Sequence, residues 1–254
     1  MAKLSIIVLT KNEERNIGSC LESVAWADEL IVLDAFSEDK TVEIARAHGA
    51  WVHQRPFRNF ADQRNAALEL ATHEWIFFVD ADERATPELA AEVRRVIEDE
   101  ELVGWWVPRH NYIFGRWVRH AGWYPDYQLR LLRRDKARYD EAREVHELVI
   151  LDGPAGYLEN TLTHYNYDNL AQFFARQDVY TNYEARIMYR QGLRARPHNF
   201  VLQPLREFRR RYIELEGYKD GWLGLLLSLL MAYYELVKYG KLWRIGLEEN
   251  EGTW

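Results

Sequence analysis

The sequence contains few of the residues that cross-link, interrupt or disorder a chain. Its 254 residues include one cysteine, Cys20, which excludes an intramolecular disulfide framework and a cysteine-based zinc site and is typical of a reducing compartment. Only 7 proline and 14 glycine residues occur, and no fixed-period repeat or low-complexity tract is present. Disordered and repeat proteins are therefore excluded, and a hydrophobic content of 48% is enough to build a sizeable core.

The sequence shows neither a secretory signal nor an apolar run long enough to span a bilayer. The first residues, MAKLSIIVLTKNEE, hold a short apolar run followed at once by charges, with no small-residue cleavage site. The apolar segment Trp222–Tyr234 ends at Glu235 after 13 residues. A membrane-spanning helix needs about 20 such residues. These features predict a cytoplasmic protein.

Charge is divided unevenly along the chain. Residues 1–103 hold 11 Lys and Arg against 21 Asp and Glu, whereas residues 104–254 hold 22 against 19. Between positions 186 and 211, eight arginines stand against a single acid, Glu207. These arginines are Arg186, Arg190, Arg194, Arg196, Arg206, Arg209, Arg210 and Arg211. Such a stretch favours a phosphate-bearing partner, and a lipid surface explains it better than nucleic acid because the first half is acidic and no recognition motif occurs.

The first 103 residues alternate short apolar runs with amphipathic segments, which is typical of strand–helix–strand units around a mostly parallel sheet. The predicted strands are Leu4–Thr10, Leu30–Ala35, Ala50–His53 and Trp75–Asp80. The predicted helices are Glu14–Ala25, residues 41–48, Ala61–Ala71 and a helix that Thr86 and Pro87 begin. The sequence thus predicts an α/β half that binds a ligand at the strand ends.

The remainder of the chain is predicted to form two further parts. Residues 104–192 are expected to complete the same domain with mixed or antiparallel strands at Trp105–His110, Gln128–Arg133 and Tyr157–Tyr165, and a helix at Asp168–Gln191. Residues 193–254 are expected to form a helical extension with helices at Phe200–Leu215 and Trp222–Tyr239. The predicted order is an α/β core, a mixed middle and a helical tail.

Acidic residues follow the predicted strands. In open α/β sheets ligands bind at the carboxyl ends of the strands. Asp34 ends the second strand, and Asp80 and Asp82 come at the end of the fourth. The Asp-x-Asp pattern alone occurs by chance, but an acid pair directly after a buried strand is costly unless a cation accompanies it. We therefore favour a metal site over solvated loop carboxylates.

Two carboxylates are too few to enclose a hard divalent ion, but they suffice when substrate phosphates complete the coordination. This points to a nucleotide-diphosphate substrate and to Lewis-acid assistance of a departing diphosphate. Asp34 is expected either to contact a base or ribose or to cap the next turn. Arg64 and Asn65 are expected to pair with a phosphate or orient the aspartates, and a surface salt bridge is the alternative.

Several segments resemble the inverting glycosyltransferases of family 2, which have the GT-A fold. The resemblance is carried by LSIIVLTKNEERNI, LIVLDAFSEDKT and RNAALELATHEWIFFVDADE, and further on by GWYPDYQLRLLRR and EVHE. The tail, PLREFRRRYIELEGYKDGWLGLLLSLLMAYYELVKYGKLW, is similar to that of lipopolysaccharide-core β-glucosyltransferases. The implied fold is a Rossmann-like mixed sheet with helices on both faces and a membrane-associating helical extension.

The resemblance implies roles for individual residues. Donor binding would involve Thr10, Asn12, Glu13, Asp34, Arg64, Asp80 and Arg130. Asp82, with Asp80, would hold Mn²⁺ or Mg²⁺. Inversion in one displacement requires a general base for the acceptor hydroxyl but no protein nucleophile. Glu147 is the leading base, Glu144 and Asp126 are alternatives, and His146 and His164 are weaker metal candidates.

The tail is predicted to associate with a membrane. Phe200–Leu215 places Val201, Leu205, Phe208, Tyr212 and Leu215 on one helical face and Arg206, Arg209 and Arg210 on the other. A basic amphipathic helix with aromatic residues lies in lipid headgroups. The alternative is a helical cap packed on the core with a solvated arginine face, and Trp222–Tyr234 is expected to dip into lipid, pack on its neighbour or form a subunit interface.

These observations predict a metal-dependent, inverting hexosyltransferase. It would move a sugar from a nucleotide-sugar, with UDP favoured, to a glycolipid or cell-envelope polysaccharide at the inner face of the membrane. One rival is an enzyme that makes polyprenyl-phosphate sugars, in which a lipid phosphate attacks. Another is a catalytically silent membrane adaptor with the same fold. A sugar-1-phosphate nucleotidyltransferase is disfavoured because no Gly-rich phosphate loop follows the first strand.

Overall fold

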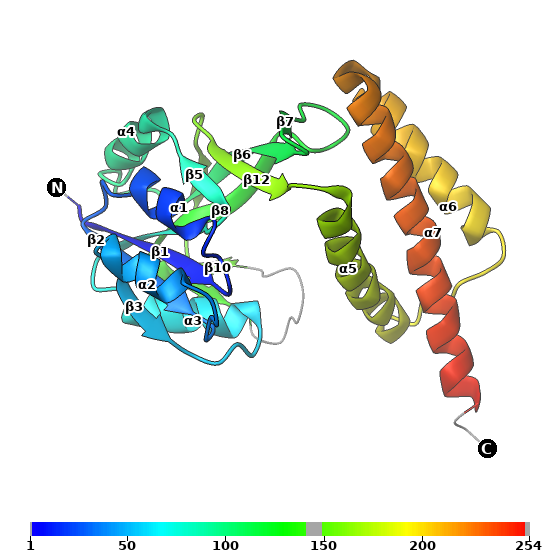
Figure 1. Cartoon of the computed structure of the whole chain (residues 1–254), viewed down its shortest axis with the longest axis horizontal. Coiled ribbons are helices and arrows are strands. Elements are labelled where there is room, and N and C mark those ends of the chain that lie inside the picture. The colour runs from blue at the N-terminus through cyan, green and yellow to red at the C-terminus, as the bar shows by residue number, and fades with distance from the viewer. Residues whose placement is uncertain (1, 141–148, 252–254) are drawn as a thin grey trace. The chain divides into compact units, whose positions relative to one another are not determined.

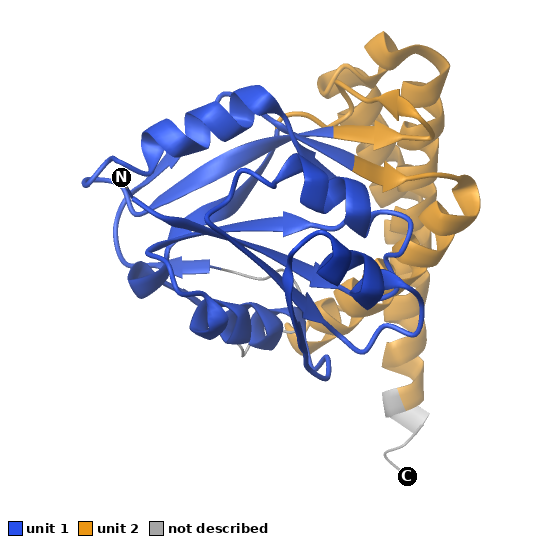
Figure 2. Ribbon diagram, turned by 60° about the vertical axis from the view of Figure 1, so that its left-hand side comes forward, with its two compact units in different colours: residues 1–110, 126–164 blue, residues 111–125, 165–254 orange. Residues whose placement is uncertain are grey.

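The computed structural model describes residues 2–140 and 149–251 and divides into two compact units (Figure 2). Unit 1 consists of Met1–His110 and Asp126–His164, and unit 2 of Asn111–Pro125 and Tyr165–Trp254. These units do not follow the expected stretches 1–103, 104–192 and 193–254. The reason is a core in unit 2 where Ile113 and Val118 pack with residues of the tail.

The parallel part of the sheet agrees with the sequence prediction. Its strands are β1 (Leu4–Thr10), β2 (Glu29–Asp34), β3 (Trp51–Gln54) and β4 (Trp75–Asp80), in the order β3-β2-β1-β4. All of their pairings are parallel. The register places Thr10 beside Asp34 and Leu9 beside Asp80, so the polar ends of three strands meet at one edge.

Helices cover both faces of this sheet, as predicted (Figure 1). They are α1 (Ile17–Ser23), α2 (Thr41–Ala47), α3 (Phe60–Leu70) and α4 (Pro87–Val96). Because successive strand residues point to opposite faces, Ile6 and Val8 pack with α1, α2 and α4, whereas Ile7 packs with α3. Thr86 caps α4 by accepting a hydrogen bond from Leu89 N, and Pro87 occupies the first helical position.

The rest of unit 1 extends the sheet with antiparallel strands. These are β5 (Glu83–Ala85), β6 (Gly104–Ile113), β8 (Asp126–Arg133), β11 (Ala155–Tyr157) and β12 (Leu162–Tyr167), while β9 (Ala137–Tyr139) and β10 (Val149–Leu151) form a separate pair after the 3-10 turn η1 (Arg134–Lys136). The single strand predicted at Tyr157–Tyr165 is wrong. The segment splits because β11 pairs parallel with β6 and β12 pairs antiparallel with β5.

Unit 2 is mainly helical. It contains β7 (Arg116–Trp117), α5 (Leu170–Arg190), α6 (Asn199–Phe208), the π-helical segment η2 (Arg209–Glu214), the 3-10 turn η3 (Gly217–Asp220) and α7 (Gly221–Glu251). Its core joins Phe173 of α5 to Leu223, Leu227 and Tyr234 of α7. α6 and α7 lie side by side and run in opposite directions (Figure 1).

The last helix is longer than the sequence predicted. The segment Gly217–Glu248 is long and apolar enough to cross a membrane by length and composition, so the expectation that it is too short is wrong. The isolated charges at Glu235 and Lys238 do not end the helix because they pair with each other. A single helix of this kind is weak evidence for a membrane protein, since core helices of soluble proteins have the same properties.

The predicted separation of apolar and basic faces in Phe200–Leu215 is only partly observed. Val201 and Leu205 are each 60% exposed, on a surface that also carries the exposed Arg206 and Arg209. Pro204 lies within α6, and the π-helical segment η2 changes the number of residues per turn. The helical phase assumed from the sequence is therefore lost, and apolar and basic side chains share the exposed surface.

Candidate functional site

The loops that follow β1 and β2 are held together at the carboxyl ends of those strands. Asn12 N donates to Ser37 Oγ at 2.8 Å, and Asn12 Oδ1 accepts from Glu38 N at 2.8 Å. Glu13 N donates to Thr41 Oγ1 at 2.7 Å. Asn12 has a left-handed backbone with φ 56°, a strained conformation that commonly occurs at functional sites.

Asp34 lies beneath these loops and has no exposed surface. Its carboxylate accepts hydrogen bonds from Thr10 Oγ1 at 3.1 Å, from Gln54 Nε2 at 3.0 Å and from Ser37 N at 2.9 Å. Burial raises the pKa of Asp34, but the donors from Ser37, Gln54 and Thr10 outweigh it and lower that pKa. This geometry is that of a turn-stabilising carboxylate, the alternative left open by the sequence.

Asp80, at the end of β4, lies against two arginines. Arg130 Nη1 donates to Asp80 Oδ1 at 3.1 Å, its Nη2 donates to Asp80 Oδ2, and Arg64 Nη2 lies 3.5 Å from Oδ1. Both arginines are almost fully buried, and Arg64 also stacks over the Phe78 ring at 4.8 Å. Burial raises the pKa of Asp80, but the charges of Arg130 and Arg64 outweigh it and hold that pKa well below its usual range.

A buried acid, Glu83, connects this cluster to Asp126. Glu83 is fully buried, accepts a hydrogen bond from Asp80 N at 2.9 Å and lies 3.1 Å from Arg109 Nη1. Arg109 also donates from Nε at 3.0 Å and from Nη2 at 2.6 Å to Asp126 Oδ2. Burial lowers the pKa of Arg109, but Glu83 and Asp126 outweigh it and raise that pKa.

The sequence analysis did not identify Glu83 or Arg109 as site residues. One indication was available. Arg109 interrupts the apolar run of Trp105–His110, and a charge on a buried strand needs a partner. The sequence alone does not say which partner, because Glu83 and Asp126 approach Arg109 only through tertiary strand pairing.

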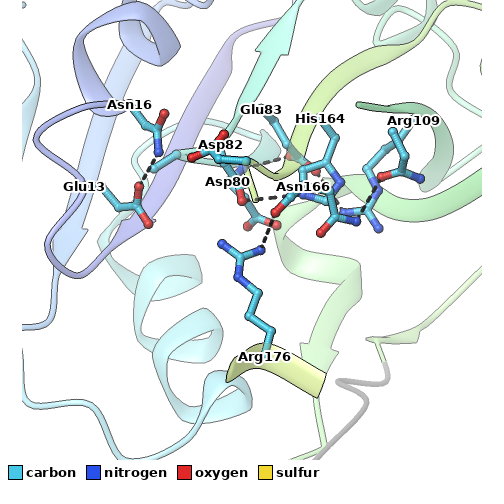
Figure 3. Close-up of polar contacts among 12 residues, drawn as sticks. Glu13, Asn16, Asp80, Asp82, Glu83, Arg109, His164, Asn166 and Arg176 are labelled. Carbon is cyan, nitrogen blue, oxygen red and sulfur yellow. Dashed lines mark hydrogen bonds and ion pairs between the residues drawn. The ribbon is translucent and has the colours of Figure 1, made fainter. Parts of the chain in front are cut away.

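Asp82 lies beside His164 on the same side of the cluster (Figure 3). His164 Nε2 is 3.6 Å from Asp82 Oδ2, and the side chains are 9% and 15% exposed. The antiparallel pairing of β12 with β5 sets this approach, because it places His164 opposite Glu83. Within residues 2–140 and 149–251, no group of three or more His, Cys, Asp or Glu side chains is placed to hold a metal ion.

The turn from Asp80 to Glu83 is tied to the loop after β1. Arg84 Nη1 donates to the carbonyl oxygens of Ala81 and Glu83 at 2.8 and 2.7 Å, and its Nη2 donates to Asn16 O at 3.1 Å. Asn16 Nδ2 in turn donates to Glu13 Oε2 at 2.8 Å (Figure 3). The predicted donor residue Glu13 is therefore linked through Asn16 and Arg84 to the Asp-x-Asp turn.

The remaining candidates lie apart from this cluster or outside the described residues. Asn65 Nδ2 donates to Tyr139 O and Asn65 Oδ1 accepts from Tyr139 N, so this side chain joins α3 to β9. Glu144, His146 and Glu147 lie outside the residues that the structure describes. Asp126 accepts from Arg109 on Oδ2 and from Gln128 Nε2 on Oδ1 at 2.9 Å, so both of its oxygens are engaged.

Comparisons with known proteins agree with the features of this site. The sequence model of glycosyl transferase family 2 matches residues 5–152. The chain is 28% identical over 250 residues to the lipopolysaccharide core biosynthesis glycosyltransferase LpsC of Rhizobium meliloti (strain 1021), covering 95% of this chain and 92% of LpsC. It is 25% identical over 282 residues to an uncharacterized glycosyltransferase of Rickettsia bellii (strain RML369-C), covering 99% and 90%.

One solved structure resembles the chain over nearly its whole length. It is S. aureus TarS 1-349 in complex with UDP-GlcNAc, with a TM-score of 0.53, 15% sequence identity, and coverage of 99% of this chain and 93% of that one. At this identity the likeness concerns the fold, which is the GT-A fold with a helical extension.

Proposed function

Because the chain belongs to glycosyl transferase family 2, we propose that it transfers one sugar, with inversion, from a nucleotide-diphosphate sugar to a hydroxyl of a membrane-associated glycolipid or cell-envelope polysaccharide. The observation that carries the proposal is the cluster at the end of β4, where Asp82 meets His164 and Asp80 meets Arg64 and Arg130. It combines ligands for a divalent cation with cations that suit a diphosphate.

The side chains at this turn fit a divalent metal ion. Asp82 and His164 offer an oxygen and a nitrogen on neighbouring groups, and both are partly shielded from water. Asp80 has its oxygens on arginines, so we assign Asp82 and His164 as ligands and Asp80 to the donor. Mn²⁺ or Mg²⁺ held there, with phosphate oxygens completing its coordination, would neutralise charge on the departing diphosphate.

The nucleotide-sugar is assigned to the loops that follow β1 and β2 and to the cluster beside them. Asn12 and Glu13 would line the nucleotide, while Thr10 and Asp34 hold their loops from below. Arg64 and Arg130 fix the orientation of Asp80, because each donates to its carboxylate. We favour UDP as the nucleotide and a hexose as the sugar.

The acceptor hydroxyl must lose a proton as it attacks the sugar. Glu147 remains the leading general base, with Glu144 as an alternative. Asp126 is less favourable because Arg109 and Gln128 engage both of its oxygens. Substitution to the amide at each position separates the three candidates, since only the base should lose turnover while keeping donor affinity.

The acceptor class follows from the relative and from the tail. LpsC is named for lipopolysaccharide core biosynthesis. Unit 2 exposes apolar side chains that alternate along α7, namely Trp222, Leu225, Leu229, Tyr233, Leu236, Trp243 and Leu247. Exposed apolar surface of this extent marks an interaction site, and the neighbouring arginines of α6 suit anionic lipid. We therefore propose peripheral attachment to the cytoplasmic face of the membrane.

The test is a thermal-shift panel of nucleotide-sugars with and without Mn²⁺, followed by a transfer assay on lipopolysaccharide core acceptors. A donor that binds only the folded protein should raise the melting temperature. A shift with UDP-sugars that depends on Mn²⁺, followed by transfer, supports the proposal. Transfer to a bare polyprenyl phosphate would instead identify a polyprenyl-phosphate glycosyltransferase, and binding without turnover on any acceptor would identify a silent adaptor.

A further inference from the structure

A cavity of about 390 Å³ lies in unit 2 between the end of α5, the start of α6 and the middle of α7. Its polar lining comes from three basic side chains, Arg194, Arg196 and His198. Its apolar lining includes Met188, Leu193 and Leu242. No Asp or Glu lines it, so the cavity combines positive charge with an apolar wall.

The positive charge of this cavity is not compensated by protein carboxylates. Within the described ranges, 2–140 and 149–251, neither Arg194 nor Arg196 forms an ion pair with Asp or Glu. The acids of neighbouring elements have other partners. Glu184 pairs with Lys238 at 3.3 Å and Asp178 with Lys241 at 2.6 Å. The arginines therefore remain available to an external anion.

Arg194 is held in place before any ligand arrives. Its Nη1 donates to the carbonyl oxygens of Tyr189 and Leu193 at 3.1 and 2.9 Å. Its guanidinium also stacks 3.7 Å from the centre of the Tyr189 ring. A planar guanidinium fixed in this way suits recognition of a phosphate group, because little side-chain freedom is lost on binding.

Apolar surface continues from the cavity onto α6. Leu193, in its wall, is 49% exposed, and α6 begins at Asn199, the next lining residue after His198. Val201, Leu202 and Leu205 then follow on the exposed surface of that helix. A ligand with a charged head and an apolar body would match this sequence of basic and apolar residues, whereas a free inorganic anion would use only the first part.

We propose that this cavity binds the phosphate headgroup of an anionic membrane lipid, with the apolar part of the lipid against Leu193 and the exposed residues of α6. The inference rests on the membrane attachment proposed above and assigns it a defined headgroup site. A diffuse basic surface would respond only to the total charge. A site made by Arg194 and Arg196 depends on where the charge lies, and this difference makes the proposal testable.

The experiment compares two double variants of the full chain with the same loss of charge. R194Q/R196Q removes the two arginines of the cavity, and R206Q/R209Q removes two exposed arginines of α6 and η2 as the matched control. Binding is measured by sedimentation with phosphatidylcholine vesicles that contain phosphatidic acid, and with vesicles of equal surface potential that contain phosphatidylglycerol. Circular dichroism confirms that each variant is folded.

We expect wild-type protein to prefer phosphatidic acid, and R194Q/R196Q to bind these vesicles about 30-fold more weakly. R206Q/R209Q should keep the preference between the two lipids even where its overall binding decreases. Leu193→Ser should weaken vesicle binding about tenfold without changing binding of inorganic phosphate. Equal losses in both double variants, or an unchanged lipid preference in R194Q/R196Q, would overturn the proposal. Tight binding of inorganic phosphate with no effect of Leu193→Ser would also overturn it.

Asp82→Asn separates this inference from the proposed enzymatic function. The substitution should abolish sugar transfer but leave vesicle binding at the wild-type level, because Asp82 belongs to unit 1 and the cavity to unit 2. If vesicle binding meets the expectations above while no nucleotide-sugar is turned over, the headgroup site stands and the enzymatic proposal fails. Transfer to a soluble acceptor analogue with no lipid preference would give the opposite result.

Discussion

His164 Nε2 lies 3.6 Å from Asp82 Oδ2, although the two residues are far apart in the sequence. The approach follows from strand pairing, because β12 runs antiparallel to β5 and places His164 opposite Glu83. A nitrogen ligand and an oxygen ligand thus meet beside the carboxyl end of β4. The pair forms the basis of the first prediction.

His164→Asn should weaken metal binding, and Asp82→Asn should abolish transfer. Loss of one ligand should raise the Mn²⁺ concentration for half-maximal activity by at least about tenfold. Electron paramagnetic resonance of free Mn²⁺ in the presence of UDP measures this binding without relying on turnover. His48→Asn is the matched control, because His48 is a partly exposed residue of another surface that contacts Glu22. Unchanged Mn²⁺ affinity in His164→Asn would remove His164 from the metal site.

Glu83→Gln should destabilise unit 1. Glu83 is fully buried between Arg109 and Arg130, and the amide would leave these cations without its charge. Removal of one partner from a buried ion pair costs about 3–5 kcal/mol. Urea unfolding measures the loss, with Glu69→Gln on the exposed surface of α3 as the control. A Glu83→Gln protein as stable as the control would show that Glu83 does not compensate these arginines.

The sequence predicted those parts of the site that depend on local pattern. The bounds of β1 and β4 agree with the structure, and Asp80 and Asp82 lie at the strand end where they were expected. The three-residue strand β5 was missed because it is too short to show a period of two residues. Arg109 was missed for a related reason, since its partners are set by tertiary pairing and leave no mark on local spacing.

The tail shows a different limit of sequence reasoning. A constant period of 3.6 residues predicted that Val201 and Leu205 share a face with Phe208 and Tyr212. The π-helical turn of η2 breaks that period, and Val201 and Leu205 are exposed while Phe208 and Tyr212 are partly buried. Periodicity identifies the existence of such a helix but not the faces of a helix whose winding changes.

The contribution of Asp80 to stability should decrease at acidic pH. Arg130 and Arg64 hold the pKa of Asp80 below its ordinary value of about 3.9, against the opposing effect of burial. A carboxylate with a lowered pKa stabilises the folded state fully above its unfolded pKa and progressively less as the pH falls toward its folded pKa. Wild type should therefore exceed Asp80→Asn in free energy of unfolding at pH 7, and the difference should shrink below about pH 4.

Urea unfolding of both proteins between pH 7 and pH 3 measures this difference. Other carboxylates with lowered pKa, such as Asp34 and Asp28, are present in both proteins and cancel in the comparison. A difference that stays constant over the whole range would show that the folded and unfolded pKa values of Asp80 are equal.

Asp34→Asn and Ser37→Ala should weaken UDP binding by similar factors. Asp34 is fully buried and accepts from Ser37 N, while Ser37 Oγ accepts from Asn12 N, so both residues act on the loop that bears Asn12. Loss of these buried hydrogen bonds should also lower stability by about 1–3 kcal/mol. Isothermal titration calorimetry with UDP measures the affinity. If only Asp34→Asn lost affinity, Asp34 would contact the nucleotide itself.

Two glycines of α7 should respond in opposite ways to alanine. A methyl group on Gly224 would lie 1.8 Å from the carbonyl oxygen of Gly217, a backbone atom that cannot move aside without disturbing η3. No atom lies within 4 Å of the corresponding position at Gly240. Gly224→Ala should therefore destabilise the protein by about 1–3 kcal/mol or more. Gly240→Ala should stabilise it by up to about 1 kcal/mol, because alanine favours the helix interior.

Thermal unfolding of the two variants checks this contrast within one helix. The same chemical change is made in both, so a difference in sign reports the local packing and not helix propensity. If Gly224→Ala proved as stable as Gly240→Ala, the close approach of α7 to Gly217 would be wrong, and with it the packing of η3 against the start of the helix. The expected result makes Gly224 a position where only the absence of a side chain allows α7 to begin directly after η3.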